Sequence, residues 1–351
     1  MLNLISYDRP GSRVLALILI ITLGALTTAP FLFEGTRALD TAARICIFIV
    51  LVASYDLMLG YGGIVSFAHT MFFGIGAYGV ALLSEAWGRG WAAVTVGAAT
   101  GIVVAAVLAV LIGLLSLRVR AIFFAMITLA IASAFAVLVS QLSGFTGGED
   151  GINFSTPRVL TPAFRPFENP VLGVDINGRI VAYYLIFVIG MALFLTMLRV
   201  VNSPFGKVLQ AIRENDFRAE AIGYRVVWYR TAVTCLSAAI AAAAGALYAI
   251  WLRYVGPGPT FSFDIMLDVL LMIVIGGMGT MYGAVIGATL FILVQNYLQT
   301  LMGAAADATS ALPLVPDLLN PDRWLLWLGV LFILAVYFFP TGIVGRLRGD
   351  A

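Results

Sequence analysis

Ten long apolar stretches, separated by shorter polar segments, dominate the chain. They lie at residues 14–33, 41–60, 64–84, 91–116, 120–141, 180–199, 229–252, 264–279, 282–301 and 324–340. Most are close to the ~20 residues that an α-helix needs to cross a bilayer. Helices are expected because an open strand edge in lipid would leave backbone groups unpaired. The pattern therefore predicts an all-α polytopic membrane protein with about 10 transmembrane helices.

Composition agrees with this pattern. Apolar residues make up 62% of the 351 positions and charged residues 11%, whereas a soluble domain has ~45–50% and ~25%. The first apolar run follows Arg9 and Arg13, as in a signal peptide, but it is longer than the usual ~7–15-residue core of one. We therefore expect this run to be retained as the first helix and residues 1–351 to form one transmembrane domain.

Basic residues are distributed unevenly among the segments that join the runs. With the N-terminus inside, twelve of the 20 basic residues fall in inside segments and seven in outside segments, although the outside segments are longer. Basic residues favour the cytoplasmic side of a membrane. Ten crossings also place both basic termini on that side. The charge pattern therefore predicts cytoplasmic N- and C-termini.

Two junctions between neighbouring runs are short and rich in glycine. One is Gly60–Gly63 and the other is Gly279–Met281. Either a tight turn or a broken helix that lines a cavity would fit them, and the sequence leaves both possibilities open. Five runs on each side of the long 142–179 segment are typical of a 5+5 inverted repeat. Leu59–Gly63 and Ile275–Gly279 are faintly similar, as such a repeat would require.

The chain lacks the residue patterns of an enzyme. It has no Gly-x-x-x-x-Gly-Lys-Ser/Thr loop to hold ATP phosphates, so an ATP-driven motor would be a separate chain. Its cysteines, Cys46 and Cys235, lie in apolar runs, and its one histidine, His69, has no His or Cys partner at ligand spacing. We therefore expect no catalytic residue, no metal site, no cofactor and no nucleic-acid partner.

A carrier driven by an ion gradient usually keeps ionisable residues deep in the membrane. Here His69 and Asp268 are the candidates that lie away from the ends of the runs, and Asp268 is only about one turn from the outside. A hydrogen-bonded polar residue between helices explains each of them equally simply. The sequence does not support a site that couples transport to an ion gradient.

The inside segment 202–230 carries the signals of two short helices. Ser203 fits an N-cap and Pro204 fits the first helical position. A second helix, roughly Phe217 to Ile222, would be ended by Gly223. The first helix places its apolar residues on one face at spacings of four and three: Phe205, Leu209 and Ile212.

Pattern alone leaves two interpretations of this segment. It is either a docking element for a cytoplasmic partner or an amphipathic segment that lies on anionic lipid. Acidic residues among the basic ones weaken the lipid interpretation because they repel an anionic surface. These are Glu214, Asp216 and Glu220.

Four blocks of the chain, in the right order, resemble the LivM-type permeases. These permeases are membrane subunits of ABC importers for branched-chain amino acids. The blocks are Leu59–His69 with Phe72–Tyr78, Thr146–Gly151, Ser203–Gly223 and Gly276–Gly283, and the C-terminal Phe339–Gly345 also fits. Together they span about residues 40–346. Ala68 departs from the family, which usually has Gly before this histidine.

The resemblance implies a permease that moves leucine, isoleucine and valine into the cytoplasm across a bacterial inner membrane. Its implied partners are a second related permease, two cytoplasmic ATPase subunits, a periplasmic substrate-binding protein and the lipid bilayer. The chain itself would not be an enzyme. Import of urea or short amides by the same architecture is an alternative, and a self-sufficient secondary transporter or channel is a more distant one.

The resemblance also implies three groups of site residues. On the cytoplasmic coupling loop, 202–230, contact with the ATPase is expected at Arg213, Glu214, Glu220, Ala221 and Gly223. The pathway or the packing of its helices is expected to involve Gly62, Gly63, Ser66, His69, Gly76, Gly277, Gly279 and Gly283. On the periplasmic loop, 142–179, contact with the binding protein is expected at Thr146, Gly147, Gly148 and Asp150. The place of any transient substrate site stays open.

Overall fold

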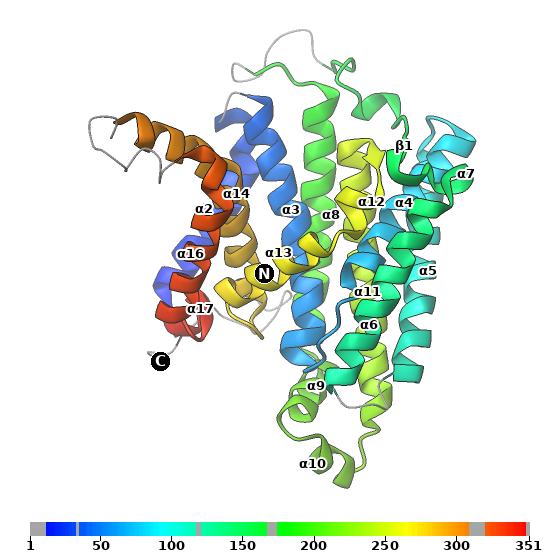
Figure 1. Ribbon diagram of the computed structural model, residues 1–351, viewed down its shortest axis with the longest axis vertical. Helices are drawn as coiled ribbons and strands as arrows, with labels where there is room; N and C mark the ends of the chain where they lie inside the picture. Colours follow the sequence, from blue (N-terminus) through cyan, green and yellow to red (C-terminus); the bar gives the residue numbers. More distant parts are fainter. Residues whose placement is uncertain (1–11, 33–34, 117–120, 167–173, 309–319, 349–351) are drawn as a thin grey trace.

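The computed structural model describes residues 12–32, 35–116, 121–166, 174–308 and 320–348 (Figure 1). Each of the ten predicted apolar runs coincides with a helix. These helices are α2 (Arg13–Leu32), α3 (Thr36–Asp56), α4 (His69–Trp87), α5 (Trp91–Ser116), α6 (Ala121–Gln141), α8 (Gly178–Val201), α11 (Val226–Leu252), α13 (Phe263–Gly276), α14 (Met281–Ala308) and α16 (Trp324–Phe338).

Shorter elements connect these helices. They are a π-helical turn η1 (Leu57–Tyr61), the helices α7 (Ser143–Thr146), α9 (Pro204–Glu214), α10 (Asp216–Ala221), α12 (Pro257–Phe261) and α17 (Gly342–Arg348), the 3₁₀ turns η2 (Gly148–Asp150), η3 (Arg158–Leu160) and η4 (Pro321–Arg323), and the strands β1 (Ile152–Asn153) and β2 (Tyr254–Val255). The two strands pair antiparallel and join the long loop to the segment after α11.

Nine helical segments within the described ranges are long and apolar enough to cross a membrane. They include η1 as the end of the α3 segment and α12 as the start of the α13 segment. α4, the remaining run, is not among them because polar residues lie at both of its ends, such as His69 and Glu85. The prediction of an all-α polytopic membrane protein is confirmed, while the sides of the two termini stay a prediction.

Helix α3 forms the centre of the bundle, and nearly all of its side chains are buried. Helices α14, α11 and α8 pack around it, and α11 in turn packs with α4 and α5, where the backbones lie close together. A methyl group at Gly79 would lie 2.6 Å from the carbonyl oxygen of Gly97, and one at Gly76 would strike the backbone of Ala242. In lipid, small residues allow this close approach, and van der Waals packing then holds the helices together.

The predicted inside and outside loops lie at opposite ends of the molecule. In Figure 1, α9 and α10 form the lowest part of the view, whereas α7 and β1 lie near the top on the other side of the helices. This arrangement is the one that two loops on opposite membrane faces require. Residues 167–173 of the long loop, within the predicted 142–179 segment, lie outside the described residues.

The predicted boundaries are wrong in three places. α4 begins at His69 and not near residue 64, because Gly63 has φ +66° and the chain leaves the helical path there. The eighth run, predicted over 264–279, ends at Gly276, because Gly277 has φ +116° and the chain leaves the helix there. Ahead of this run, the side chain of Ser262 accepts a hydrogen bond from Asp264 N and separates α13 from α12. α14 continues to Ala308, into the segment predicted to be an outside loop.

Candidate coupling site

Helix α9 begins and packs as its sequence predicts. The hydroxyl of Ser203 accepts a hydrogen bond from Gly206 N at 3.4 Å, and Pro204 is the first helical residue. Leu209 and Ile212 are buried, and the ring of Phe205 stacks on that of Tyr229 at 5.7 Å between centroids. The apolar face of α9 is therefore used inside the protein and is not free to lie on lipid.

Helix α10 follows at once and has a cap at each end. The side chain of Asn215 accepts from Arg218 N at 2.9 Å, a cap that the sequence analysis did not identify. Gly223 has φ +99°, which ends the helix at the predicted residue, and a methyl group added there would meet no atom within 4 Å. Its role is conformational, since only glycine adopts this backbone geometry without strain.

Arg213, at the end of α9, is exposed and also contacts the membrane helices. Its guanidinium donates a hydrogen bond to the carbonyl oxygen of Gly60 in η1. A methyl group at Gly63 would lie 3.2 Å from Cγ of Arg213, and one at Gly279 would lie 2.8 Å from its Nη1. Arg213 thus lies against both glycine junctions of the membrane helices.

The two junctions also contact each other directly. The buried carboxylate of Asp56, in the last turn of α3, accepts a hydrogen bond from Gly279 N at 2.8 Å. A methyl group at Gly60 would come within 2.5 Å of that same nitrogen. The coupling helix α9, the end of α3 and the turn between α13 and α14 therefore meet at one point.

Neither junction is a continuous helix. The first is the π-helical turn η1, followed by a non-helical segment, residues 62–68, that leads to α4. The second is a turn in which Gly277 has φ +116° and Gly279 has φ +79°. An inverted repeat would place equivalent segments at opposite ends of the membrane helices. The two junctions instead lie side by side at the same end, so the similarity between Leu59–Gly63 and Ile275–Gly279 does not support such a repeat. The 5+5 repeat stays a prediction.

The outer loop is held in shape by Thr146. Its hydroxyl donates to the carbonyl oxygens of Val139 at 2.5 Å and Leu142 at 2.8 Å, and it accepts from Gly148 N at 3.3 Å. Gly147 has φ +73° and Gly148 has φ +61°, so the turn depends on glycine. Thr146 and Gly148 are buried and Asp150 is exposed, so a protein at this end could touch the carboxylate while the buried residues shape the loop.

Comparison with known proteins identifies the family. The sequence profile described as "Branched-chain amino acid transport system / permease component" matches residues 37–336. The chain belongs to this permease family. It is 27% identical over 304 residues to the high-affinity branched-chain amino acid transport system permease protein LivM of Escherichia coli, covering 82% of this chain and 70% of that one.

Two further relatives are similar. The LivM protein of Salmonella typhimurium is 27% identical over 303 residues, with the same coverage of each chain. A probable branched-chain amino acid transport permease protein LivM of Methanocaldococcus jannaschii is 27% identical over 249 residues, covering 69% of this chain and 67% of that one. No solved structure matches the chain. The match and the apolar helices make it a multi-pass protein of the bacterial inner membrane.

Most of the predicted pathway residues of the permease are buried, whereas Gly63 is exposed and Gly279 is half-buried. Nε2 of His69 lies 2.9 Å from the hydroxyl of Ser54, and its ring packs on Tyr55 at 5.0 Å between centroids. Ser66 accepts from Ala68 N at 3.2 Å. The glycines of the second junction, Gly277, Gly279 and Gly283, lie in or beside the turn. His69 therefore has a structural hydrogen bond of the kind expected from the sequence.

The exposed candidates lie on α10 and at the end of α9. They are Arg213, Glu214, Glu220, Ala221 and Gly223. Two neighbouring apolar side chains that the sequence analysis did not assign to the site are also exposed, Phe217 by 84% and Ile222 by 68%. The sequence could have identified them, because they are apolar residues that do not belong to the apolar face formed by Leu209 and Ile212.

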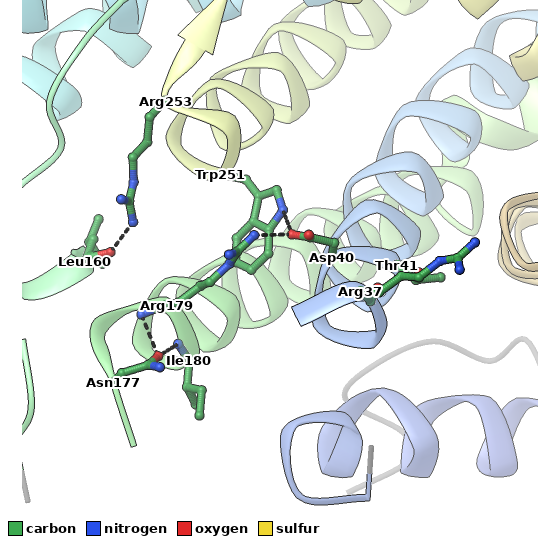
Figure 2. Close-up of polar contacts among 9 residues, drawn as sticks. All are labelled: Arg37, Asp40, Thr41, Leu160, Asn177, Arg179, Ile180, Trp251 and Arg253. Carbon is green, nitrogen blue, oxygen red and sulfur yellow. Dashed lines mark hydrogen bonds and ion pairs between the residues drawn. The ribbon is translucent and has the colours of Figure 1, made fainter. Parts of the chain in front are cut away.

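Sequence reasoning also missed a polar cluster at the outer end of the permease, shown in Figure 2. Asp40 at the start of α3 pairs with Arg179 at 2.5 Å and accepts from Trp251 Nε1 at 3.1 Å. Next to it, Arg253 donates to Leu160 O at 2.7 Å, and burial, followed by the charge of Arg179, lowers the pKa of Arg253. The cluster ties α3, α8 and α11 together where their outer ends meet.

Proposed function

We propose that this chain is the permease subunit of an ATP-binding cassette importer that moves branched-chain amino acids into the cytoplasm. The names of the relatives in Escherichia coli and Salmonella typhimurium favour leucine, isoleucine and valine over urea or short amides. The partners are a second related permease, two cytoplasmic ATPase subunits and a periplasmic substrate-binding protein. The chain itself has no catalytic role, needs no cofactor and leaves ATP hydrolysis to the ATPase subunits.

The observation that carries the proposal is the exposed apolar tip of the coupling loop. The apolar face of α9 is buried inside the protein, yet Phe217 and Ile222 on and beside α10 are 84% and 68% exposed. Exposed apolar groups with a polar rim are typical of a surface for a protein partner. The rim here is acidic as well as basic, with Glu220 between the two apolar residues, which favours a protein groove over anionic lipid.

The geometry behind the tip supports a mechanical link. The buried apolar face and the Ser203 cap fix α9 against the membrane helices. Arg213 continues the link to Gly60, and Asp56 joins that turn to Gly279. Because packed helices move as rigid units, a displacement of α10 by an ATPase would reach both junctions together. The outer loop around Thr146 would receive the binding protein at the opposite end.

Charge reversal at Glu220 tests the docking surface. We expect Glu220→Arg and Phe217→Ala each to reduce co-purification of the ATPase subunits with the permease and to abolish ATP-driven leucine uptake in vesicles. Glu85→Arg, an exposed charge reversal at the C-terminal end of α4, is the matched control and should leave both unchanged. Normal uptake with Glu220→Arg would contradict the assignment of the loop.

The substrate is tested by competition. ATP-driven uptake of labelled leucine by the complete transporter should be inhibited by unlabelled isoleucine and valine, and not by urea or acetamide. Inhibition by urea with no effect of isoleucine would favour the alternative substrate class.

A further inference from the structure

A cavity of about 270 Å³ lies where two interrupted membrane segments meet. One wall comes from the segment before α4 and from the start of α4, one from α6, and one from the break between α12 and α13. The lining includes Phe67, Thr70, Leu129, Ser133, Ser262 and Phe263. Its volume is near the lower end, about 300 Å³, of sites that bind small molecules.

The start of α4 at this cavity has no cap. The N-cap position is Ala68, whose side chain cannot accept a hydrogen bond. The next three residues, His69, Thr70 and Met71, are buried, and within the described residues no acceptor is found for their backbone N–H groups. The first N–H groups of a helix need partners from a side chain, water or a ligand. Because this helix start is buried and has no side-chain cap, its first N–H groups are available to an acceptor.

The side chain of Thr70 gives a second, independent observation. It is 3% exposed and lines the cavity, and its hydroxyl has no hydrogen-bond partner in the part of the chain that the structure describes. Nearby hydroxyls are used: Ser66 accepts from Ala68 N, and Ser262 accepts from Asp264 N. Because the Thr70 oxygen is not among the fully buried unpaired atoms of the described residues, the hydroxyl is open to the cavity and free to pair with a polar ligand there.

The chemistry of the cavity matches an aliphatic amino acid. The N-terminus of a helix attracts a carboxylate through its free N–H groups and the helix dipole, and interrupted membrane helices use this end to hold anionic substrate groups. Phe67, Leu129 and Phe263 supply apolar walls. Asp264 follows this wall and accepts from the lining Ser262 at 3.2 Å, which places a negative charge near the break for an ammonium group.

Resting on the proposed function, we propose that this cavity is the transient site of the transported amino acid. Its carboxylate binds the Thr70 hydroxyl and the free N–H groups at the start of α4, and its branched side chain lies against Phe67 and Phe263. The larger cavity, about 480 Å³ between α4, α5 and α6, has an almost entirely apolar lining that includes Leu82 and Val104 and no helix start. Such a lining does not compensate the desolvation of a zwitterion.

Protection from chemical labelling tests the site. The complete transporter carries Cys46→Ser and Cys235→Ser, which remove the native cysteines of this chain, together with Ser133→Cys at an exposed position of the cavity. The new cysteine is labelled by a small methanethiosulfonate reagent. We expect leucine to slow this labelling and leucinol, which lacks the carboxylate, to leave it unchanged. Thr100→Cys, on the other cavity, is the control and should react at the same rate with and without leucine.

Thr70 is tested in the same assay. Thr70→Val removes the hydroxyl at nearly constant shape and should raise the half-protecting leucine concentration about tenfold, the usual effect of a lost hydrogen bond to a charged group. Thr70→Ser keeps the hydroxyl and should restore protection. Rescue by Ser but not Val separates ligand contact from a general effect on folding.

The outcomes separate this site from the proposed function. Equal protection by leucine and leucinol, or no protection at Ser133→Cys in a transporter that still takes up leucine with ATP, would overturn the site and leave the importer assignment intact. A wild-type transporter that hydrolyses ATP without leucine uptake would overturn both. Carboxylate-dependent protection that is lost in Thr70→Val would support the site.

Discussion

The contact between the two glycine junctions gives a sharp prediction for Gly60→Ala. A methyl group at Gly60 would lie 2.5 Å from Gly279 N and 2.7 Å from Cγ of Asp56, and closer still to one carboxylate oxygen. Ordinary carbon contacts need about 3.5–4.0 Å. The turns would have to move apart by about 1 Å, which breaks the 2.8 Å hydrogen bond between Gly279 N and Asp56.

The magnitude follows from these two effects. Overpacking of a tight core costs about 1–3 kcal/mol, and the lost hydrogen bond to a carboxylate costs about 1.5–3 kcal/mol. Replacing glycine by alanine in a helix returns about 1 kcal/mol. The free energy of unfolding should therefore fall by about 1.5–5 kcal/mol. At about 2–4 °C per kcal/mol, the scale of domains of ~150–250 residues, that lowers the Tm by about 3–20 °C.

Thermal unfolding of the purified permease in detergent measures this effect. Gly24→Ala is the matched control, because a methyl group at Gly24 in α2 would meet no atom within 4 Å. We expect Gly24→Ala to keep the wild-type Tm or to raise it slightly, and Gly60→Ala to lower it. Equal melting of the two variants would refute the contact between the junctions.

Two further predictions concern the outer end. Thr146→Val removes the hydroxyl that donates to Val139 O and accepts from Gly148 N, whereas Leu142 O keeps the N–H groups of Phe145 and Thr146 as donors. The free energy of unfolding should therefore fall by about 1–3 kcal/mol, and limited proteolysis should cut the outer loop faster; an unchanged cleavage rate would contradict the hydroxyl's role. Asp40→Asn weakens the ion pair between Asp40 and Arg179, whose side chains are 38% and 34% exposed. We therefore expect the free energy of unfolding to fall by no more than about 1 kcal/mol. A large drop in the Tm would contradict this expectation.

Local signals in the sequence were enough to predict the helices. Each apolar run became a helix because a membrane-embedded backbone must satisfy its own hydrogen bonds. The coupling loop was predicted in detail, from the Ser203 cap to the stop at Gly223, because caps act within four residues of the chain. The short helix α12 was not predicted, because Pro257–Phe261 lies before the apolar run that begins at residue 264.

Contacts between distant segments were not predictable in this way. Asp56 and Gly279 are 223 positions apart, and Arg213 and Gly60 are 153 apart. Nothing in the residues near Arg213 distinguishes a side chain that reaches into the helices from one that faces a partner. Asp40 and Arg179 likewise stand at the outer ends of two separate runs, so their pairing depends on helix packing.

The substrate cavity could not be located from the sequence for a similar reason. Thr70 is an ordinary helix residue in the chain, and only the structure shows that this buried residue lines a cavity. The non-helical segment 62–68 brings the start of α4 to that wall. The sequence left the Gly60–Gly63 junction open between a turn and a broken helix, and that choice determines where α4 begins.

The central claim is that the coupling loop links ATP hydrolysis to movement of the membrane helices, and the ratio of leucine transported to ATP hydrolysed tests it most directly. The ratio is measured in proteoliposomes that contain the complete transporter with Arg213→Gln. The control is Arg89→Gln, which changes an exposed arginine at the opposite end of the protein. Because Arg213→Gln removes the charged hydrogen bond to Gly60, we predict that ATP hydrolysis persists while the ratio falls at least about tenfold. A ratio equal to that of the wild type and of Arg89→Gln would contradict the account.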